Sequence, residues 1–368
     1  MKSIAILGTV GVPASYGGFE TLAENLIRFN QENLLDQKIT VYCSSINLSS
    51  KPRFYLGAKL RYIKINANGV SSIAYDILSL LSAIWYRNDV ILLLGVSGAI
   101  SLPLIRILSS AIIVTNVDGV EWKREKWKGA ARWFLKLSEK MAVNFSHDVI
   151  ADNEGIAEHI NQTYGRRVHV IAYGGDQALS ANSKPFEEIS LPARYALSVC
   201  RIEPENNIAM ILEAFASKIS IPLVFVGNWN NSNFGIELRR QYALNLNIHM
   251  IDPIYDIGIL RTLRENAFIY IHGHSAGGTN PSLVEMMHFG IPILSYDCVF
   301  NRFTTEDSAI FFKNAESLRM NLEKLKPDEA KSIGNNIRKI ALKRYTWAAI
   351  GKAYFDLLIG IENFPNKN

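Results

Sequence analysis

The chain has 368 residues and a formal net charge of +5, with 48% hydrophobic and 20% charged residues. This composition is typical of a soluble α/β protein and excludes a disordered or fibrous chain, and the length allows two domains with complete cores. The positive excess lies in residues 1–175, which hold 19 Lys and Arg against 14 Asp and Glu, because the remainder has 20 of each. No basic, apolar leader precedes Ser3–Leu7. We therefore expect a cytoplasmic protein, and we expect no nucleic-acid partner.

Apolar runs typical of buried strands alternate with helix-like segments along the whole chain. The expected strands are 3–7, 38–43, 60–65, 90–94, 111–115, 148–151, 168–171, 195–200, 222–226, 248–251, 268–271 and 291–294. A polar stretch at 176–192 interrupts this order and reads as a linker, and three helical stretches, 316–325, 328–344 and 347–361, end the chain. Continuous apolar strands separated by helices predict two parallel sheets, with a cleft at their carboxyl ends.

The longest apolar region, Val90–Val114, resembles a membrane span at first sight. It contains Gly95, Gly98, Pro103 and Arg106. An arginine near the middle of a bilayer is costly, so we expect a strand, a helix over about 98–108 and a second strand here instead of a transmembrane helix.

The turn after the first strand carries paired glycines, Gly17 and Gly18, before a helix of about 19–29. It lacks the Gly-x-Gly-x-x-Gly fingerprint, and Ser44 and Ser45 stand where an acidic residue would bind a ribose, which disfavours an NAD-dependent oxidoreductase. The paired glycines would still let a ligand phosphate approach the backbone, and a plain strand-to-helix turn is the alternative.

A second glycine-rich loop follows the apolar run that ends near His272. Its residues are Gly277, Gly278, Thr279, Asn280, Pro281 and Ser282, and a helix opening at Pro281 carries Glu285 and ends at Gly290. Such a turn aims backbone N–H groups and the positive end of a helix dipole at one point, which predicts an anion site. An ordinary strand-loop-helix connection is the alternative.

Residues 123–140 form a basic segment with seven Lys or Arg and two Glu. Helical spacing places Arg132, Lys136 and Lys140 on one column and Trp133 on the next. Basic residues interleaved with tryptophan suit an anionic membrane surface. A solvated helix face with its tryptophans in the core is the alternative.

Several motifs together resemble retaining glycosyltransferases of family 4, which have the GT-B fold. They are the loop and helix to Glu285 with Gly290-Ile-Pro, the Val199-Cys-Arg201-Ile-Glu-Pro-Glu-Asn206 segment, Gly17-Gly18, and Tyr345-Thr-Trp347. The stretches Gly11–Asn25, Asp118–Arg124 and Gly277–Glu285 are similar to a bacterial subgroup that includes rhamnosyltransferases of cell-surface polysaccharide assembly.

This resemblance implies two Rossmann-like domains facing across a cleft, with the C-terminal helices returning to the first domain. We expect an acceptor-binding domain at 1–175, a linker at 176–193, a nucleotide-sugar-binding domain at 194–345 and a returning helix at 346–368. The donor would be a nucleotide-diphosphate sugar, with dTDP-L-rhamnose favoured. The acceptor would be a saccharide, favoured to be linked to polyprenyl diphosphate.

In the second half, the resemblance implies that Arg201 neutralises the diphosphate. It also implies that Glu285 accepts hydrogen bonds from the ribose. Backbone and hydroxyl groups of the segment from Thr279 to Leu283 would donate to phosphate or sugar. An interdomain salt bridge for Arg201 and a surface helix acid for Glu285 are the alternatives. Two positions depart from the family. Gly277 stands where a glutamate is common and Asn206 where a lysine is common. We expect the loop amides to replace part of the lost stabilisation.

On the acceptor side, the candidates to orient or deprotonate the incoming hydroxyl are Asp118, Glu121 and Asp152, and helix capping is the alternative for Asp118 and Asp152. No Asp-x-Asp motif or His/Cys cluster with metal-ligand spacing occurs in the sequence, so we expect transfer without a metal or cofactor.

A lipid-linked acceptor implies peripheral association with the inner face of the cytoplasmic membrane. The basic residues expected to contact it are Lys123, Arg124, Lys126, Lys128 and Arg132. Two other functions fit the same architecture: a nucleotide-sugar 2-epimerase, and a non-catalytic assembly scaffold with a degenerate donor site.

Overall fold

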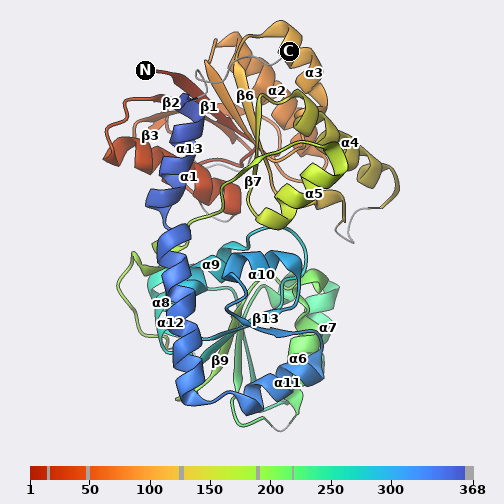
Figure 1. The fold of residues 1–368 in the computed structure, drawn as a ribbon, viewed down its shortest axis with the longest axis vertical. Coiled ribbons are helices and arrows are strands. Elements are labelled where there is room, and N and C mark those ends of the chain that lie inside the picture. The colour runs from red at the N-terminus through yellow and green to blue at the C-terminus, as the bar shows by residue number, and fades with distance from the viewer. Residues whose placement is uncertain (15–16, 47–49, 124–127, 188–190, 218, 361–368) are drawn as a thin grey trace. The chain divides into compact units, whose positions relative to one another are not determined.

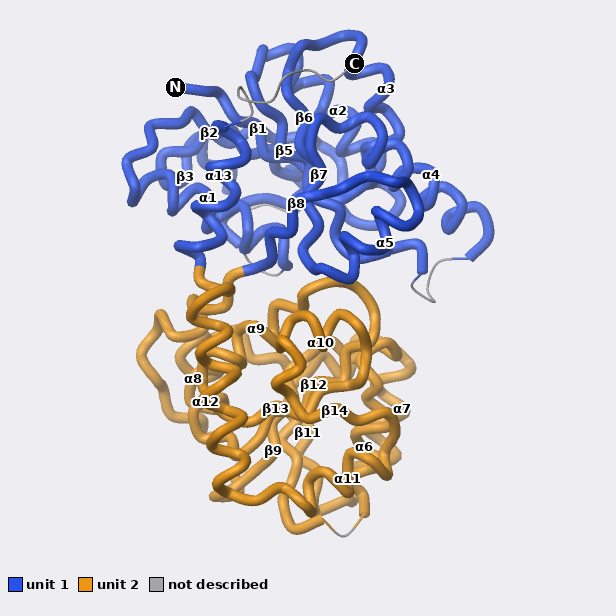
Figure 2. Tube along the Cα trace, in the orientation of Figure 1, with its two compact units in different colours: residues 1–173, 347–368 blue, residues 174–346 orange. Residues whose placement is uncertain are grey.

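The computed structural model describes residues 1–14, 17–46, 50–123, 128–187, 191–217 and 219–360 (Figure 1). The chain divides into two compact units, Met1–Tyr173 with Trp347–Asn368, and Gly174–Thr346 (Figure 2). Each unit is built around its own largely parallel sheet covered by helices. The predicted α/β class with two sheets is confirmed.

The sheet of the first unit has the strand order β3-β4-β2-β1-β5-β6-β7-β8, and all its pairs are parallel except β3 with β4. Its strands are β1 (Ser3–Leu7), β2 (Lys38–Ser44), β3 (Phe54–Tyr55), β4 (Ala58–Ile63), β5 (Val90–Leu94), β6 (Ile112–Val117), β7 (Asp148–Ala151) and β8 (His169–Val170). The helices are α1 (Gly18–Glu32), α2 (Ser71–Trp85), α3 (Leu102–Leu108), α4 (Gly129–Phe145), α5 (Glu154–Tyr164) and α13 (Trp347–Gly360). The central strand β5, whose sequence is VILLL, is buried along its whole length because helices cover both faces of the sheet.

The sheet of the second unit has the order β11-β10-β9-β12-β13-β14, with every pair parallel. Its strands are β9 (Ala196–Val199), β10 (Leu223–Val226), β11 (Ile248–Ile251), β12 (Ile269–His272), β13 (Ile293–Tyr296) and β14 (Ile310–Phe312). Its helices are α6 (Ile208–Ala216), α7 (Asn233–Tyr242), α8 (Ile257–Glu265), α9 (Pro281–Met287), α10 (Val299–Thr305), α11 (Ala315–Lys324) and α12 (Pro327–Arg344). Numbered within the unit, this is the 3-2-1-4-5-6 order of a Rossmann fold.

The last helix returns to the first unit, as the resemblance implied. The rings of Phe29 on α1 and Phe355 on α13 stack with their centroids 5.7 Å apart. A side chain at Gly351 would come within 2.4 Å of the Phe29 ring, so only glycine allows this close approach of the helices. The amide of Asn116, at the end of β6, donates to the hydroxyl of Tyr354 at 2.6 Å. These contacts join α13 to the core of the first unit.

The sequence missed β3 and β14, and it placed the strand near residue 60 about two residues too far along the chain. β3 has only two residues and pairs antiparallel at the sheet edge, so it leaves no apolar run to detect. The helix expected from 98 begins instead as a 3₁₀ turn, Ala99–Ser101, before the seven residues of α3. Pro103 lies in the first turn of α3, where its missing N–H costs no helical hydrogen bond.

Candidate functional site

Arg201 and the glycine-rich loop lie at neighbouring strand ends in the second unit. Strands β9 and β12 pair in parallel, with Ala196 opposite Ile269 and Leu197 opposite Tyr270. Arg201 follows β9, and the loop that begins at Gly273 follows β12. The chain passes from β9 to β10 on one side of this point and from β12 to β13 on the other side. Open α/β sheets bind their ligands where the direction of the connections reverses in this way. The fold therefore brings the two predicted donor elements together.

The glycine-rich loop packs tightly against the segment that follows Arg201. A side chain at Gly273 would lie 2.1 Å from the carbonyl oxygen of Asn206, so this crossing requires glycine. Ser275 donates from its backbone N–H and its hydroxyl to the carbonyl of Glu205, at 2.9 and 2.8 Å. Gly277 has a φ of +100°, a conformation that favours glycine.

The residues at the start of α9 use part of their predicted donor capacity internally. Asn280 caps the helix, because its Oδ1 accepts from the N–H of Ser282 at 3.0 Å and from the Ser282 hydroxyl at 2.8 Å. Thr279 is 4% exposed and Leu283 is fully buried. The Ser282 hydroxyl completes a helix cap, and the N–H of Leu283 donates to the carbonyl of Asn280 at 3.0 Å, so these two donors have partners within the protein. The predicted contacts of Thr279–Leu283 with phosphate or sugar stay a prediction.

Glu285 is held by two side chains that the sequence analysis did not single out. Its Oε1 accepts from Nε2 of Gln177 at 2.7 Å, and its Oε2 accepts from Nη2 of Arg264 on α8. The side chain of Glu285 is 20% exposed and that of Arg264 is 6% exposed, so the alternative of a surface helix acid is wrong. A carboxylate has lone pairs beyond these two bonds, so ribose hydroxyls can still donate to it.

Arg201 is more accessible than Arg264, the other arginine described at this site. Its side chain is 44% exposed, and its Nη1 lies 3.4 Å from Oε1 of Glu203. Exposed ion pairs of this kind contribute little stability, so the guanidinium can turn toward a stronger anion at little cost. A diphosphate can accept two parallel hydrogen bonds from it.

Asn206 does not take over the role of the missing lysine. Its side chain is 4% exposed. Nδ2 donates to the carbonyl of Arg201 at 2.7 Å, and Oδ1 lies 2.7 Å from Nδ1 of His274. Because a carbonyl can only accept, the amide orientation is determined, and Nδ1 of His274 must carry the proton. Asn206 thereby ties the backbone of Arg201 to the imidazole of His274.

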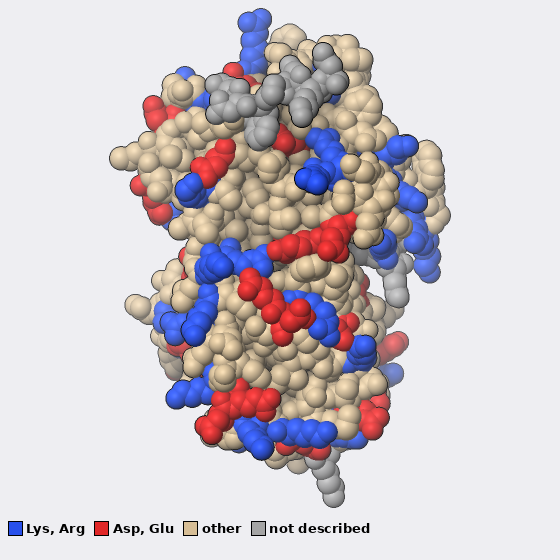
Figure 3. Space-filling model, viewed as in Figure 1, with Lys and Arg blue, Asp and Glu red and all other residues tan. Residues whose placement is uncertain are grey.

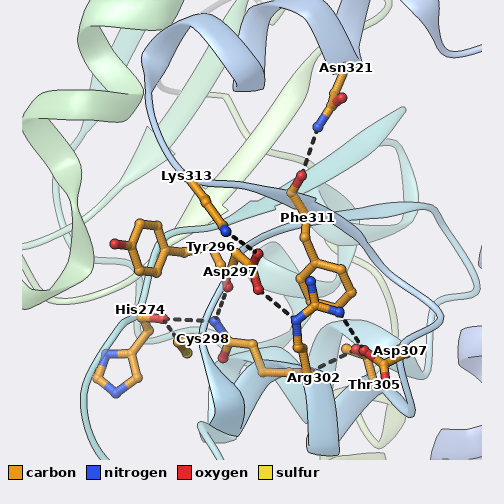
Figure 4. A network of polar contacts seen from close by, with 11 residues as sticks. His274, Tyr296, Asp297, Cys298, Arg302, Thr305, Asp307, Phe311, Lys313 and Asn321 are labelled. Carbon is orange, nitrogen blue, oxygen red and sulfur yellow. Dashed lines mark hydrogen bonds and ion pairs between the residues drawn. The ribbon is translucent and has the colours of Figure 1, made fainter.

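His274 is a site residue that the sequence analysis missed. Its carbonyl accepts from Nδ2 of Asn301 at 2.8 Å and from Sγ of Cys298 at 3.8 Å, and Figure 4 shows the Cys298 contact. Beside it, Asp297 pairs with Arg302 at 2.6 Å and with Lys313 at 3.5 Å. The backbone of His274 is therefore fixed by α10. The sequence signal for His274 was the run His272-Gly273-His274 at the end of an apolar strand.

In the first unit, Asp118 and Asp152 follow the adjacent parallel strands β6 and β7. Tyr173 lies near both carboxylates, and its pKa is raised well above the usual value by burial, by Asp118 and then by Asp152. The N-cap residue of α5 is Asn153, whose Oδ1 accepts from the N–H of Gly155 at 2.8 Å. Two of the three candidate acids, Asp118 and Asp152, therefore lie at the carboxyl ends of neighbouring strands.

Glu121 begins a short 3₁₀ turn, Glu121–Lys123, that is anchored through Trp122. The indole N–H of Trp122 donates to Oε2 of Glu139 on α4 at 3.1 Å, and Glu139 is 2% exposed. The same carboxylate accepts from the hydroxyl of Tyr164 at 2.7 Å. These contacts fix the backbone that carries Glu121.

The paired glycines of the first unit make room for a protein carboxylate. A side chain at Gly17, whose φ is +141°, would lie 1.9 Å from Oε2 of Glu20. Oε1 of Glu20 accepts from the N–H of Val10 at 2.7 Å and from the hydroxyl of Thr9 at 3.0 Å. This carboxylate already accepts from one amide of the turn, that of Val10, and contact of Gly17 and Gly18 with a donor phosphate stays a prediction.

Of the basic residues expected to contact a membrane, Arg124 and Lys126 lie outside the described residues. Lys123, Lys128 and Arg132 are exposed. Trp133 is 66% exposed, so the alternative that places the tryptophans of this segment in the core is wrong for Trp133.

Among the described residues, no three His, Cys, Asp or Glu side chains are grouped so that they could hold a metal ion. The helices within the described part of the chain are each too short or too polar to cross a bilayer.

Two family models match the chain. Residues 1–176 match "Domain of unknown function (DUF1972)" and residues 180–340 match "Glycosyl transferases group 1". Among curated proteins, none matches significantly.

Several solved structures have the same two-domain fold. Sucrose-phosphate synthase from Thermosynechococcus elongatus is similar with a TM-score of 0.80 and 14% identity, over 98% of this chain and 99% of that one. A glycosyltransferase from Rickettsia africae has a TM-score of 0.73 and 15% identity, over 99% of both chains. Anabaena HepE in complex with UDP has a TM-score of 0.70 and 14% identity, over 98% of this chain and 100% of that one.

These similarities establish the GT-B fold, and the family match over residues 180–340 covers Arg201, Glu285 and the glycine-rich loop between them. The chain therefore carries a glycosyl transferases group 1 domain and is a GT-B glycosyltransferase.

Proposed function

We propose that the protein is a retaining glycosyltransferase that moves L-rhamnose from dTDP-L-rhamnose to a saccharide acceptor linked to polyprenyl diphosphate, in the assembly of a cell-surface polysaccharide. The observation that carries the donor part is the meeting of Arg201 and the loop from Gly273 at the ends of β9 and β12. This is the position where open α/β sheets bind nucleotides.

The chemistry of the donor site follows from the leaving group. As the bond from the anomeric carbon to the diphosphate oxygen breaks, negative charge develops on the diphosphate. The Arg201 guanidinium, which is 44% exposed, supplies a fixed positive charge there, and it is assisted by backbone N–H groups of the loop. Glu285, oriented by Arg264 and Gln177, accepts hydrogen bonds from the ribose.

A deoxy sugar is consistent with the loop sequence. Gly277 stands where the resembling family commonly has a glutamate, so the loop offers no carboxylate at that position. A 6-deoxyhexose has one hydroxyl fewer and needs fewer acidic contacts. HepE, a protein with the same fold, has been solved with UDP and with UDP and glucose, which supports a nucleotide-sugar donor in general.

The first unit would present the acceptor. Asp118 and Asp152 at the ends of β6 and β7 are carboxylates that can orient or deprotonate an incoming hydroxyl. The cationic groups of Lys123, Arg132 and Lys136 lie 5.1 to 5.6 Å from the ring centroid of Trp122. Clustered cations with tryptophan fit phosphate headgroups, so this segment supports contact with the membrane that holds a lipid-linked acceptor.

Ligand-induced stabilisation tests this proposal, because a ligand that binds the folded state raises the melting temperature. We expect dTDP to stabilise the full-length protein more than UDP or GDP does. Incubation of dTDP-L-rhamnose without acceptor should leave the sugar unchanged, whereas an epimerase would convert it. If none of the three nucleotides changes the melting temperature, the result favours the scaffold alternative and contradicts the proposal.

A further inference from the structure

Helix α2 exposes an apolar face. Its exposed residues, Ala74, Leu78, Leu81 and Trp85, follow one another at helical spacing and form a single stripe. The exposed fractions of Leu78, Leu81 and Trp85 are 45%, 38% and 81%. α2 contacts β1, β4 and α3, and this stripe stays exposed.

The neighbouring helix α3 continues this surface. It contacts α2 on one side and α4 on the other. Leu104, Ile107 and Leu108 are 56%, 82% and 57% exposed. These side chains come from the apolar region that resembled a membrane span in the sequence, and seven helical residues are far too few to span a bilayer. Together α2 and α3 present six large apolar side chains, which we call the apolar face: Leu78, Leu81, Trp85, Leu104, Ile107 and Leu108.

The exposed charged side chains of α2, α3 and α4 all have one sign. The only acidic residues of α2, α3 and α4 are Asp76 and Glu139, and both are buried. The exposed charged residues of these helices are all cations: Arg106, Arg132, Lys136 and Lys140. Figure 3 shows Lys and Arg side chains gathered over α4, beside a largely uncharged surface over α3.

We propose that the apolar face inserts into the interfacial layer of an anionic membrane, while the cations of α3 and α4 contact lipid phosphates. Apolar side chains bordered by Lys and Arg, without exposed carboxylates, are the chemistry that interfacial helices use. A second copy of the chain fits less well, because pairing two such faces would bring cation against cation. This inference rests on the proposed function in one respect: membrane binding would bring the enzyme to an acceptor that is held in the membrane.

This mode of binding differs from electrostatic docking by the basic segment alone. Apolar insertion persists when salt screens the charges, whereas attraction between exposed cations and lipid phosphates weakens as ionic strength rises. The two contributions are therefore separable in one assay.

Co-sedimentation of the full-length protein with vesicles of phosphatidylcholine and phosphatidylglycerol tests the inference. We expect the double variant Trp85→Ser/Ile107→Ser to bind about ten- to a hundred-fold more weakly at both low and high salt. Lys136→Glu/Lys140→Glu should weaken binding mainly at low salt. The control Leu244→Ser removes a side chain that is 95% exposed in the second unit and should bind like the wild type.

Two further measurements keep the outcomes distinct. The melting temperature of each variant and its increase with dTDP should match the wild type, because the substituted side chains are exposed and lie in the other unit from Arg201. Sedimentation velocity should show the same oligomeric state for Trp85→Ser/Ile107→Ser and the wild type. Unchanged vesicle binding by this double variant would overturn the inference. If the wild type is a dimer and the double variant is a monomer, the apolar face serves self-association and the inference is overturned. If the wild type does not bind dTDP, that result counts against the proposed function and not against this inference.

Discussion

Asn206 and His274 form a hydrogen bond of 2.7 Å between Oδ1 and Nδ1, in the second unit beside the carboxyl ends of β9 and β12. The other end of the amide donates to the carbonyl of Arg201. One buried side chain therefore fixes two loops of the candidate donor site in relation to each other. A neutral amide here orients the site and adds no charge to it.

Replacing Asn206 by alanine should damage both the fold and donor binding. The substitution leaves the Arg201 carbonyl and Nδ1 of His274 without these partners, which we expect to cost about 1–3 kcal/mol of unfolding free energy. Because the Arg201 loop loses its anchor, the Kd for dTDP should also increase. Denaturant unfolding and calorimetry measure the two effects. Asn161→Ala, an exposed position on α5, is the control, and an Asn206→Ala protein with normal dTDP affinity would contradict this role.

Arg264 and Glu285 should be strongly coupled energetically. Removing one partner of a buried ion pair leaves an uncompensated charge, so Glu285→Gln should lower the unfolding free energy by about 3 kcal/mol. The double variant Arg264→Met/Glu285→Gln should recover part of that loss. A double-mutant cycle in urea measures the coupling. Strict additivity of the two single substitutions would show that the pair does not stabilise α9.

The fold was largely predictable from the sequence, because continuous apolar strands leave a strong pattern. Strands β1, β5, β7 and β11 have the predicted bounds. The short edge strands β3 and β14 were missed, since two or three residues carry no period. The position of Arg201 beside the glycine-rich loop also followed from the order of the elements.

The partners of the site residues could not be predicted in the same way. Gln177 lies 108 positions from Glu285 and His274 lies 68 positions from Asn206, so only tertiary packing brings them together. The turn at Gly17 has a protein partner of the same unpredictable kind. The carboxylate of Glu20 lies beside Gly17 and accepts from the N–H of Val10, and no glycine pattern reveals such a partner.

Asp118 should act on transfer and not on donor binding. If it orients or deprotonates the acceptor hydroxyl, Asp118→Asn should lower kcat by about 10²- to 10⁴-fold while the Kd for dTDP stays constant. Steady-state kinetics with calorimetry separates the two quantities. Glu158→Gln, at an exposed position on α5, serves as the control. A kcat within a factor of two of the wild type would move the role to Asp152 or Glu121.

Asp76 should make stability depend on pH. Burial raises the pKa of this carboxyl from 3.8 to about 8, and its Oδ1 has no hydrogen-bond partner. In the unfolded chain it loses its proton near pH 4, whereas the folded protein keeps the proton up to about pH 8. The folded state therefore binds more protons in this window, and stability falls as the pH rises through it.

Asp76→Asn should remove this contribution and flatten the stability profile between pH 4 and pH 8. We expect the variant to be more stable than the wild type at pH 7, as measured by urea unfolding at several pH values. Glu139 is also buried but accepts hydrogen bonds from Trp122 and Tyr164, so Glu139→Gln should lower stability instead. A wild-type profile with no slope attributable to Asp76 would contradict the assignment.

The central claim is that the Arg201 guanidinium at the end of β9 neutralises a nucleoside diphosphate. Isothermal titration of the full-length protein with dTDP tests it most directly. The Kd for dTDP is compared among the wild type, Arg201→Ala and Arg201→Lys, after their melting temperatures have been shown to be equal. We predict that the wild type binds, that alanine raises the Kd by about ten- to a hundred-fold and that lysine restores only part of the affinity. Equal affinity of the wild type and Arg201→Ala for dTDP would contradict the account.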